Sequence, residues 1–296
     1  MRSFRTPAIF TAYACILLLM SLSQVLWTLR QGFVTVSGMR AGIDGYIWMT
    51  FLQFALIVLI APAMTAGSIA SERERQTLDL ILVTQTGAFK IALGKLLDGF
   101  LFLGVLVISS APFLSLVFLT GGITPLQVAR TLLFLMVSAF AALSVGLFAS
   151  ALFKRTAAAA VTAYLIVFAI GLGTLIPLFN GAQNAIARLA NDAALMQSIT
   201  TEQALALIPK SALVNPAIGL VSLLVDQTEL IRQTFSGAIP YGYVYYSLFE
   251  EIRFDIVANI NMAIMAGLGL CFALAAAALI RPRARRIARI RRGAAR

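Results

Sequence analysis

Long apolar runs separated by short polar segments dominate the chain. Six of these runs reach the roughly 20 residues that an α-helix needs to cross a bilayer. They cover residues 7–29, 46–70, 96–119, 127–153, 157–179 and 256–280. Hydrocarbon offers no hydrogen-bond partners, so the backbone of each run must be bonded within its own helix. The pattern predicts an all-α membrane protein with six transmembrane helices, forming a single transmembrane domain over residues 1–296.

The composition agrees with a membrane protein. Of the 296 residues, 60% are hydrophobic and only 12% are charged, whereas soluble domains carry about 25% charged residues. A water-soluble fold and a disordered chain are therefore excluded. The chain contains no histidine, which excludes Ser-His hydrolysis and histidine metal sites. Cys15 and Cys271 fall inside apolar runs, where we expect them to be packing residues rather than disulfide partners.

The positive charges predict the orientation of the chain in the membrane. With the N-terminus inside, 16 of the 23 Lys and Arg residues fall in inner segments, and eight of these are arginines of the tail 281–296. Basic residues near the ends of spans favour the cytoplasmic side. We therefore expect both termini in the cytoplasm. We also expect the net charge of +11 to lie at the membrane surface rather than to bind nucleic acid.

One long segment, residues 180–255, is expected outside the cell. Its run 211–225, interrupted by Asn215-Pro216, is too short to span a bilayer and predicts an interfacial or re-entrant segment. Two interpretations remain open, an outer gate or substrate-facing cap and an amphipathic plug resting on the outer leaflet. The spans themselves contain few deep charges, which disfavours a proton- or ion-coupled carrier. We expect Arg130 to snorkel from a span end, and Asn259 and Asn261 to link helices.

The polar hairpin between the second and third spans predicts a helix over residues 71–83. Ser71 and Glu74 have the spacing of a capping box, and three apolar residues that follow share one face. Lys95 and Asp98 lie one helical turn apart at the start of the third span and are expected to form an ion pair. From these residues alone, a solvated connecting helix and a docking helix are both possible.

The chain resembles the ABC-2-type exporter permeases over roughly residues 60–175. The resemblance lies in the Glu72-Arg73-Glu74 start of the hairpin, the Thr77-Leu78-Asp79-Leu80 helix and the Ile91-x-x-Gly94-Lys95-Leu96 entry into the third span. It continues with Gly121-Gly122, Leu152-Phe153-Lys154-Arg155-Thr156 and Asn215-Pro216.

The resemblance implies a permease subunit of an ATP-driven exporter in the cell membrane of a bacterium. Such a permease pairs with a second permease, a copy or a homologue, and binds two cytoplasmic ATPase subunits. The hairpin would carry the coupling helix that seats on the ATPase. The implied interface consists of Glu72, Arg73, Glu74, Arg75, Thr77, Leu78 and Asp79.

The chain itself is expected to be non-catalytic and to bind no cofactor, with ATP and Mg held by the partner ATPase. Gly94-Lys95 lacks the first glycine and the Ser/Thr of a phosphate-binding loop, because Phe89 and Leu96 occupy those positions. Two alternatives are a membrane scaffold that transmits ATPase motion to an external partner, and an ion-coupled carrier or channel.

Overall fold

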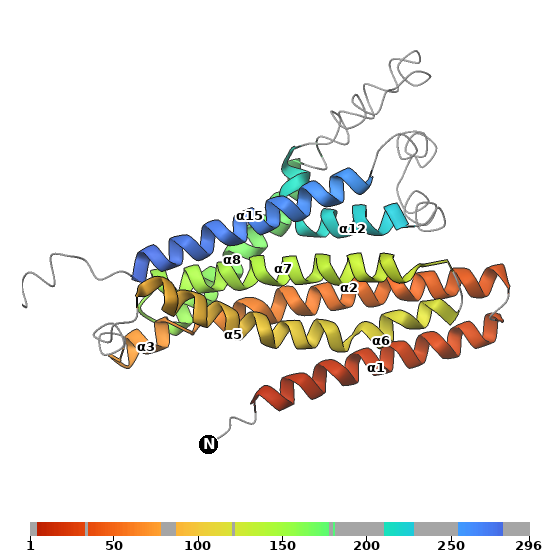
Figure 1. Ribbon diagram of the computed structural model, residues 1–296, viewed down its shortest axis with the longest axis horizontal. Helices are drawn as coiled ribbons and strands as arrows, with labels where there is room; N and C mark the ends of the chain where they lie inside the picture. Colours follow the sequence, from red (N-terminus) through yellow and green to blue (C-terminus); the bar gives the residue numbers. More distant parts are fainter. Residues whose placement is uncertain are drawn as a thin grey trace, which may run out of the picture. The chain divides into compact units, whose positions relative to one another are not determined.

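The computed structural model describes residues 5–32, 35–77, 87–119, 122–177, 180, 210–227 and 254–280. Within those ranges every regular element is a helix (Figure 1). The long helices are α1 (Arg5–Gln31), α2 (Val36–Ala66), α5 (Ala88–Ser109), α7 (Pro125–Leu152), α8 (Thr156–Gly173) and α15 (Phe254–Ile280). Six helical segments of the described residues are long and apolar enough to cross a membrane, which confirms the six-span prediction. The orientation of the termini stays a prediction, as does the single domain.

The apolar pattern predicts where the long helices lie, but not the residues at which they begin and end. Helix α2 starts at Val36 and α5 at Ala88, ten and eight residues before the expected spans. A helix needs internal hydrogen bonds but no apolar side chains, so it can continue into polar sequence outside the hydrocarbon. The third span is also interrupted after Ser109, where the short α6 (Ala111–Leu114) and the 3-10 helix η1 (Ser115–Leu119) follow. Pro112 explains the interruption, because proline has no N–H and clashes with the preceding turn.

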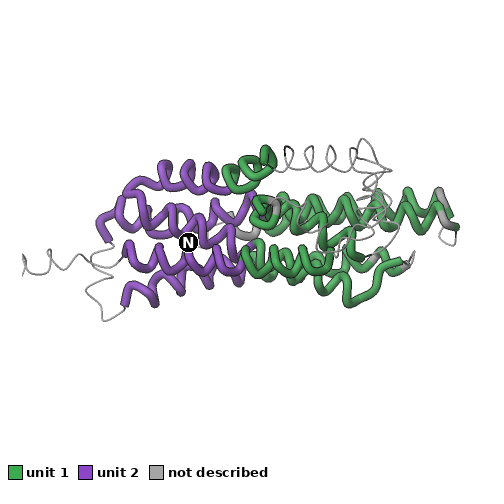
Figure 2. Tube along the Cα trace, turned by 90° about the horizontal axis from the view of Figure 1, so that it is seen from above, with its two compact units in different colours: residues 1–57, 103–138, 168–265 green, residues 58–102, 139–167, 266–296 purple. Residues whose placement is uncertain are grey.

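Contacts along the chain define two compact units (Figure 2). Unit 2 comprises residues 58–102, 139–167 and 266–296. Its buried residues include a cluster of small side chains, Ala66, Ala149 and Ala163, and such residues let membrane helices approach closely. A Cβ added to Gly146 would lie 2.9 Å from the Pro62 carbonyl oxygen, so glycine is required where α7 meets α2.

Unit 1 comprises residues 1–57, 103–138 and 168–265. It contains the 3-10 helix η2 (Lys210–Val214) and the short helix α12 (Pro216–Gln227), which lies beside α15 in Figure 1. As expected, this apolar segment is too short to span a membrane. Seven of the 12 residues of α12 are buried, so the helix is packed among other helices of unit 1.

Several predicted features cannot be compared with the fold. Most of the external segment 180–255 and the whole basic tail 281–296 lie outside the described residues. Cys15 and Cys271 are both described; their thiols are free and both side chains are exposed.

Candidate functional site

The candidate site is the hairpin that connects α2 to α5 in unit 2. The chain leaves α2 and forms the five-residue helix α3 (Ala70–Glu74). The first amides of a helix have no partner within it, and here the backbone N–H groups of Ile69 and Ala70 both donate to the Ser150 hydroxyl oxygen at 2.9 Å. The expected capping box is wrong, because Ile69 occupies the N-cap position and Ser71 lies within the helix. The acceptor comes instead from α7, about 80 residues further along the chain.

Glu72 ties α3 to α5. Its carboxylate lies 2.6 Å from the Lys95 ammonium group, and the Glu72 side chain is only 16% exposed. The second carboxylate oxygen of Glu72 is buried without a hydrogen-bond partner, so Lys95 neutralises a carboxylate that water scarcely reaches. The expected Lys95–Asp98 pair is wrong, and Asp98 is exposed. The attraction of an ammonium group to a poorly hydrated carboxylate exceeds its attraction to one in water. Lys95 therefore pairs with Glu72 rather than with Asp98, its neighbour in sequence.

Arg73 ties α3 to the ends of α7 and α15. Its guanidinium donates to the carbonyl oxygens of Ala151 at 2.5 Å, Phe153 at 3.5 Å and Leu279 at 3.5 Å. The last carbonyls of a helix lack intrahelical partners, and the helix dipole makes that end negative. Hydrogen bonds from a charged group are worth about 1.5–3 kcal/mol. One cation therefore satisfies the C-terminal ends of two helices.

Helix α3 ends in a Schellman motif. The Gln76 N–H donates to the Arg73 carbonyl at 3.2 Å, and the Thr77 N–H donates to the Glu72 carbonyl at 2.9 Å, which is the bonding pattern of that motif. Gln76 has φ +58°, a left-handed conformation that usually falls to glycine. The expected continuous helix 71–83 is therefore wrong at residues 75–77, because a left-handed residue reverses the chain there. Leu78 and Asp79 lie outside the described residues.

The expected interface residues consequently divide into two groups. Glu72 and Arg73 point into unit 2 and bind α5, α7 and α15, while Thr77 is half-buried. Glu74 and Arg75 are exposed, as is the neighbouring Gln76. The structure thus reduces the outward face of the hairpin, within its described part, to these three polar side chains.

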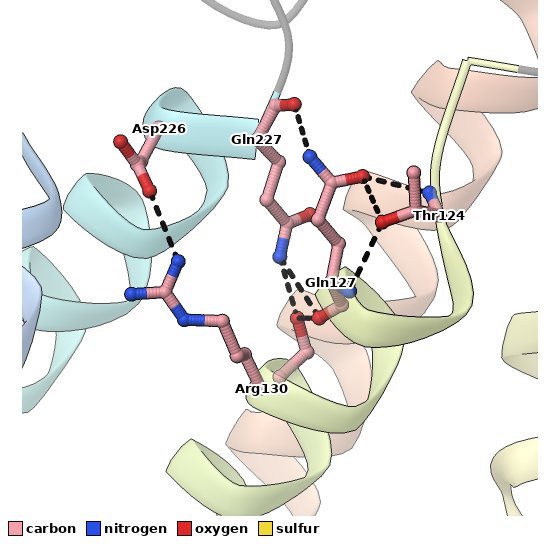
Figure 3. Close-up of polar contacts among 6 residues, drawn as sticks. Thr124, Gln127, Arg130, Asp226 and Gln227 are labelled. Carbon is pink, nitrogen blue, oxygen red and sulfur yellow. Dashed lines mark hydrogen bonds and ion pairs between the residues drawn. The ribbon is translucent and has the colours of Figure 1, made fainter.

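A second set of polar contacts, in unit 1, fixes the C-terminal end of α12 to α7 (Figure 3). The Gln127 amide donates to the Gln227 carbonyl, and the Gln227 amide donates to the Gln127 carbonyl at 3.3 Å. The guanidinium of Arg130, the residue expected to snorkel, lies 3.4 Å from the Asp226 carboxylate. Paired amides and an ion pair therefore hold this end of the short helix.

The N-terminal end of α12 is fixed by two asparagines. Asn215 donates to the Gly171 carbonyl of α8 at 2.8 Å. Asn261 on α15 donates to the carbonyls of Leu213 at 2.7 Å and Asn215 at 3.0 Å. The prediction that Asn261 links helices is confirmed, whereas Asn259 is exposed. Long-range partners such as these could not be identified from residue spacing.

The described residues show no group suited to a metal ion. Three or more His, Cys, Asp or Glu side chains converge nowhere in that part of the chain. The polar contacts of the two sites are ion pairs, amide hydrogen bonds and hydrogen bonds at helix ends.

Comparison with known families finds a match over most of the chain. A family profile described as "ABC-2 family transporter protein" matches residues 40–278. This range includes all of the hairpin and most of every long helix except α1. None of the curated proteins matches the chain.

Proposed function

Because the chain belongs to the ABC-2 family of transporter proteins, we propose that it is the permease subunit of an ATP-driven exporter. In this proposal it forms the translocation path together with a second copy or a homologous permease. ATP and Mg are bound by separate cytoplasmic ATPase subunits. Both termini and the hairpin around α3 face the cytoplasm, in agreement with the distribution of Lys and Arg.

The observation that carries the proposal is the two-sided arrangement of α3. Its inner side is bound by Ser150, by Lys95 through Glu72, and by helix ends through Arg73. Its outer side presents Glu74 and Arg75 to solvent. A connecting turn needs no such anchoring. A helix that receives force from a partner needs both a free polar surface for contact and firm attachment to the helices that must move.

The outer side can be tested without disturbing the inner one. We expect the double variant Glu74→Lys/Arg75→Glu to insert and fold normally, because both side chains are exposed. Like charges opposed across an interface cost several kcal/mol, and about 1.4 kcal/mol is tenfold in affinity. The variant should therefore bind at least about tenfold more weakly to the ATPase that co-purifies with the wild-type chain.

The matched control is Arg30→Glu/Arg40→Glu, which reverses two exposed charges on the side expected to be external. It should retain wild-type affinity for the ATPase. Equal binding by the Glu74/Arg75 variant and by wild type would reject α3 as the docking element. Flux in vesicles that contain the permease without any ATPase would reject the exporter itself in favour of a carrier. ATPase binding with no flux of any substrate would favour the scaffold.

A further inference from the structure

The contacts of Arg73 connect α3 to two long helices at once. Its guanidinium donates to carbonyls in the last residues of α7 and just after it, at Ala151 and Phe153, and in the last turn of α15, at Leu279. We propose that Arg73 is the positioning residue that carries a displacement of α3 to the ends of α7 and α15. This inference rests on the proposed function, because it assumes that a partner moves α3.

Helices α7 and α15 are packed against each other before the ends that Arg73 binds. The rings of Phe148 and Phe272 lie 5.3 Å apart. A Cβ added to Gly269 would lie 3.2 Å from the Ala141 Cα, so the two backbones approach closely. These contacts lie at least about one turn before the end of α7 and at least about two turns before the end of α15 that Arg73 binds. The two ends beyond them can therefore move by different amounts, and the bond from Arg73 decides how far the end of α15 follows α3.

The other anchors of α3 do not reach α15. Glu72 bonds Lys95 on α5, and Ser150 belongs to α7. Among the described side chains of α3, only that of Arg73 donates a hydrogen bond to a carbonyl of α15. Loss of Arg73 should consequently uncouple α15 from α3 while α3 stays attached to α5 and α7.

The geometry requires arginine rather than any cation. A guanidinium is a planar fork with five N–H donors, whereas an ammonium group is a compact point charge on a flexible chain. Arginine can thus serve carbonyls on two helices simultaneously. Lysine at position 73 would hold the nearest acceptor, the Ala151 carbonyl at the end of α7, and would release the Leu279 carbonyl of α15.

The test follows helix-end movement in the complete complex with its co-purified ATPase. In a Cys15→Ser/Cys271→Ser background, one spin label is placed at Leu97 on α5. The second label is placed at Ala278 near the end of α15, or at Lys154 just after α7. All three positions are exposed. The change in each distance between the nucleotide-free and the vanadate-trapped Mg-ATP states is measured by double electron–electron resonance in nanodiscs.

With wild-type Arg73, we expect both distances to change on trapping. With Arg73→Met, ATPase binding should persist and the change at Ala278 should be lost. With Arg73→Lys, the change at Lys154 should be kept and that at Ala278 reduced by about half or more. The control Lys90→Met removes an exposed cation of the same unit and should behave as wild type.

The outcomes separate the two proposals. If the wild-type chain binds no ATPase, the proposed function fails and the inference falls with it. If binding is normal but Arg73→Met keeps the full change at Ala278, the inference alone is wrong. Should Arg73→Met fail to fold, Arg73→Lys decides, because wild-type changes at both ends in that variant would overturn the inference. Absence of any change at Ala278 in the wild-type complex would overturn it as well.

Discussion

Ser150 offers the sharpest test of how the hairpin is held. Its hydroxyl oxygen accepts from the backbone N–H groups of Ile69 and Ala70, and all three residues are completely buried. The substitution Ser150→Ala removes the acceptor and leaves two buried donors without a partner. A larger side chain is not introduced, so packing around position 150 is otherwise preserved.

The expected magnitude follows from the cost of unsatisfied donors. Each buried donor left without a partner costs about 1–3 kcal/mol. The two amides together predict a loss of about 2–6 kcal/mol in the free energy of unfolding, a large share of the 5–15 kcal/mol typical of native proteins. Ala is a slightly better helix former than Ser, which offsets only a few tenths of a kcal/mol.

Ser144→Ala is the matched control on the same helix. Ser144 is also completely buried, but its hydroxyl donates to the Phe140 carbonyl of α7 itself. Removing that hydroxyl leaves no backbone donor without a partner, so we expect the free energy of unfolding to fall by less than about 1 kcal/mol. The helix-propensity term is the same for both variants and cancels in the comparison.

The assay is reversible unfolding in mixed micelles, supported by hydrogen exchange. Ser150→Ala should lower the unfolding free energy well below that of Ser144→Ala, and it should speed exchange of the amides in residues 66–75. Two variants that agree within about 0.5 kcal/mol would refute the reasoning, because water or another group would then be satisfying Ile69 and Ala70.

Two further predictions concern local backbone and helix contacts. Replacing Gln76 by glycine should raise the unfolding free energy by about 0.5–1 kcal/mol, since its φ of +58° strains any residue with a Cβ; a less stable variant in chemical denaturation would contradict the Schellman assignment. Replacing Asn261 by alanine should cost about 1–2 kcal/mol through its two lost hydrogen bonds. The exposed Asn259, replaced in the same way, should cost less than about 0.5 kcal/mol, and equal losses at the two positions would contradict the assigned role of Asn261.

The spans were predictable because they depend on one requirement that the sequence states directly. A bilayer demands about 20 consecutive apolar residues, and the described helices α1, α2, α5, α7, α8 and α15 meet it. The role of Asn261 followed from similar reasoning, since a buried amide within a span needs a partner on another helix.

The hairpin could not be predicted in the same way, because its partners are distant in sequence. The capping-box spacing of Ser71 and Glu74 was real, but Ser150 provides the acceptor. The spacing of Lys95 and Asp98 was equally suggestive, but Glu72 is the partner of Lys95. The helix end at Gln76 carries no glycine that would have signalled it. Local patterns identify which residues can interact, and tertiary packing selects among them.

The charged run from Glu72 to Arg75 shows why this selection matters for function. Successive residues of a helix point about 100° apart, so four consecutive charges cannot all face the same partner. The first two bind inside unit 2 and the next two are exposed. Reversing Glu72 would therefore remove a carboxylate that is only 16% exposed and place a cation against Lys95, and any loss of ATPase binding would reflect damage to the hairpin. Reversing Glu74 and Arg75 changes the outer surface alone, so only those positions can separate docking from folding.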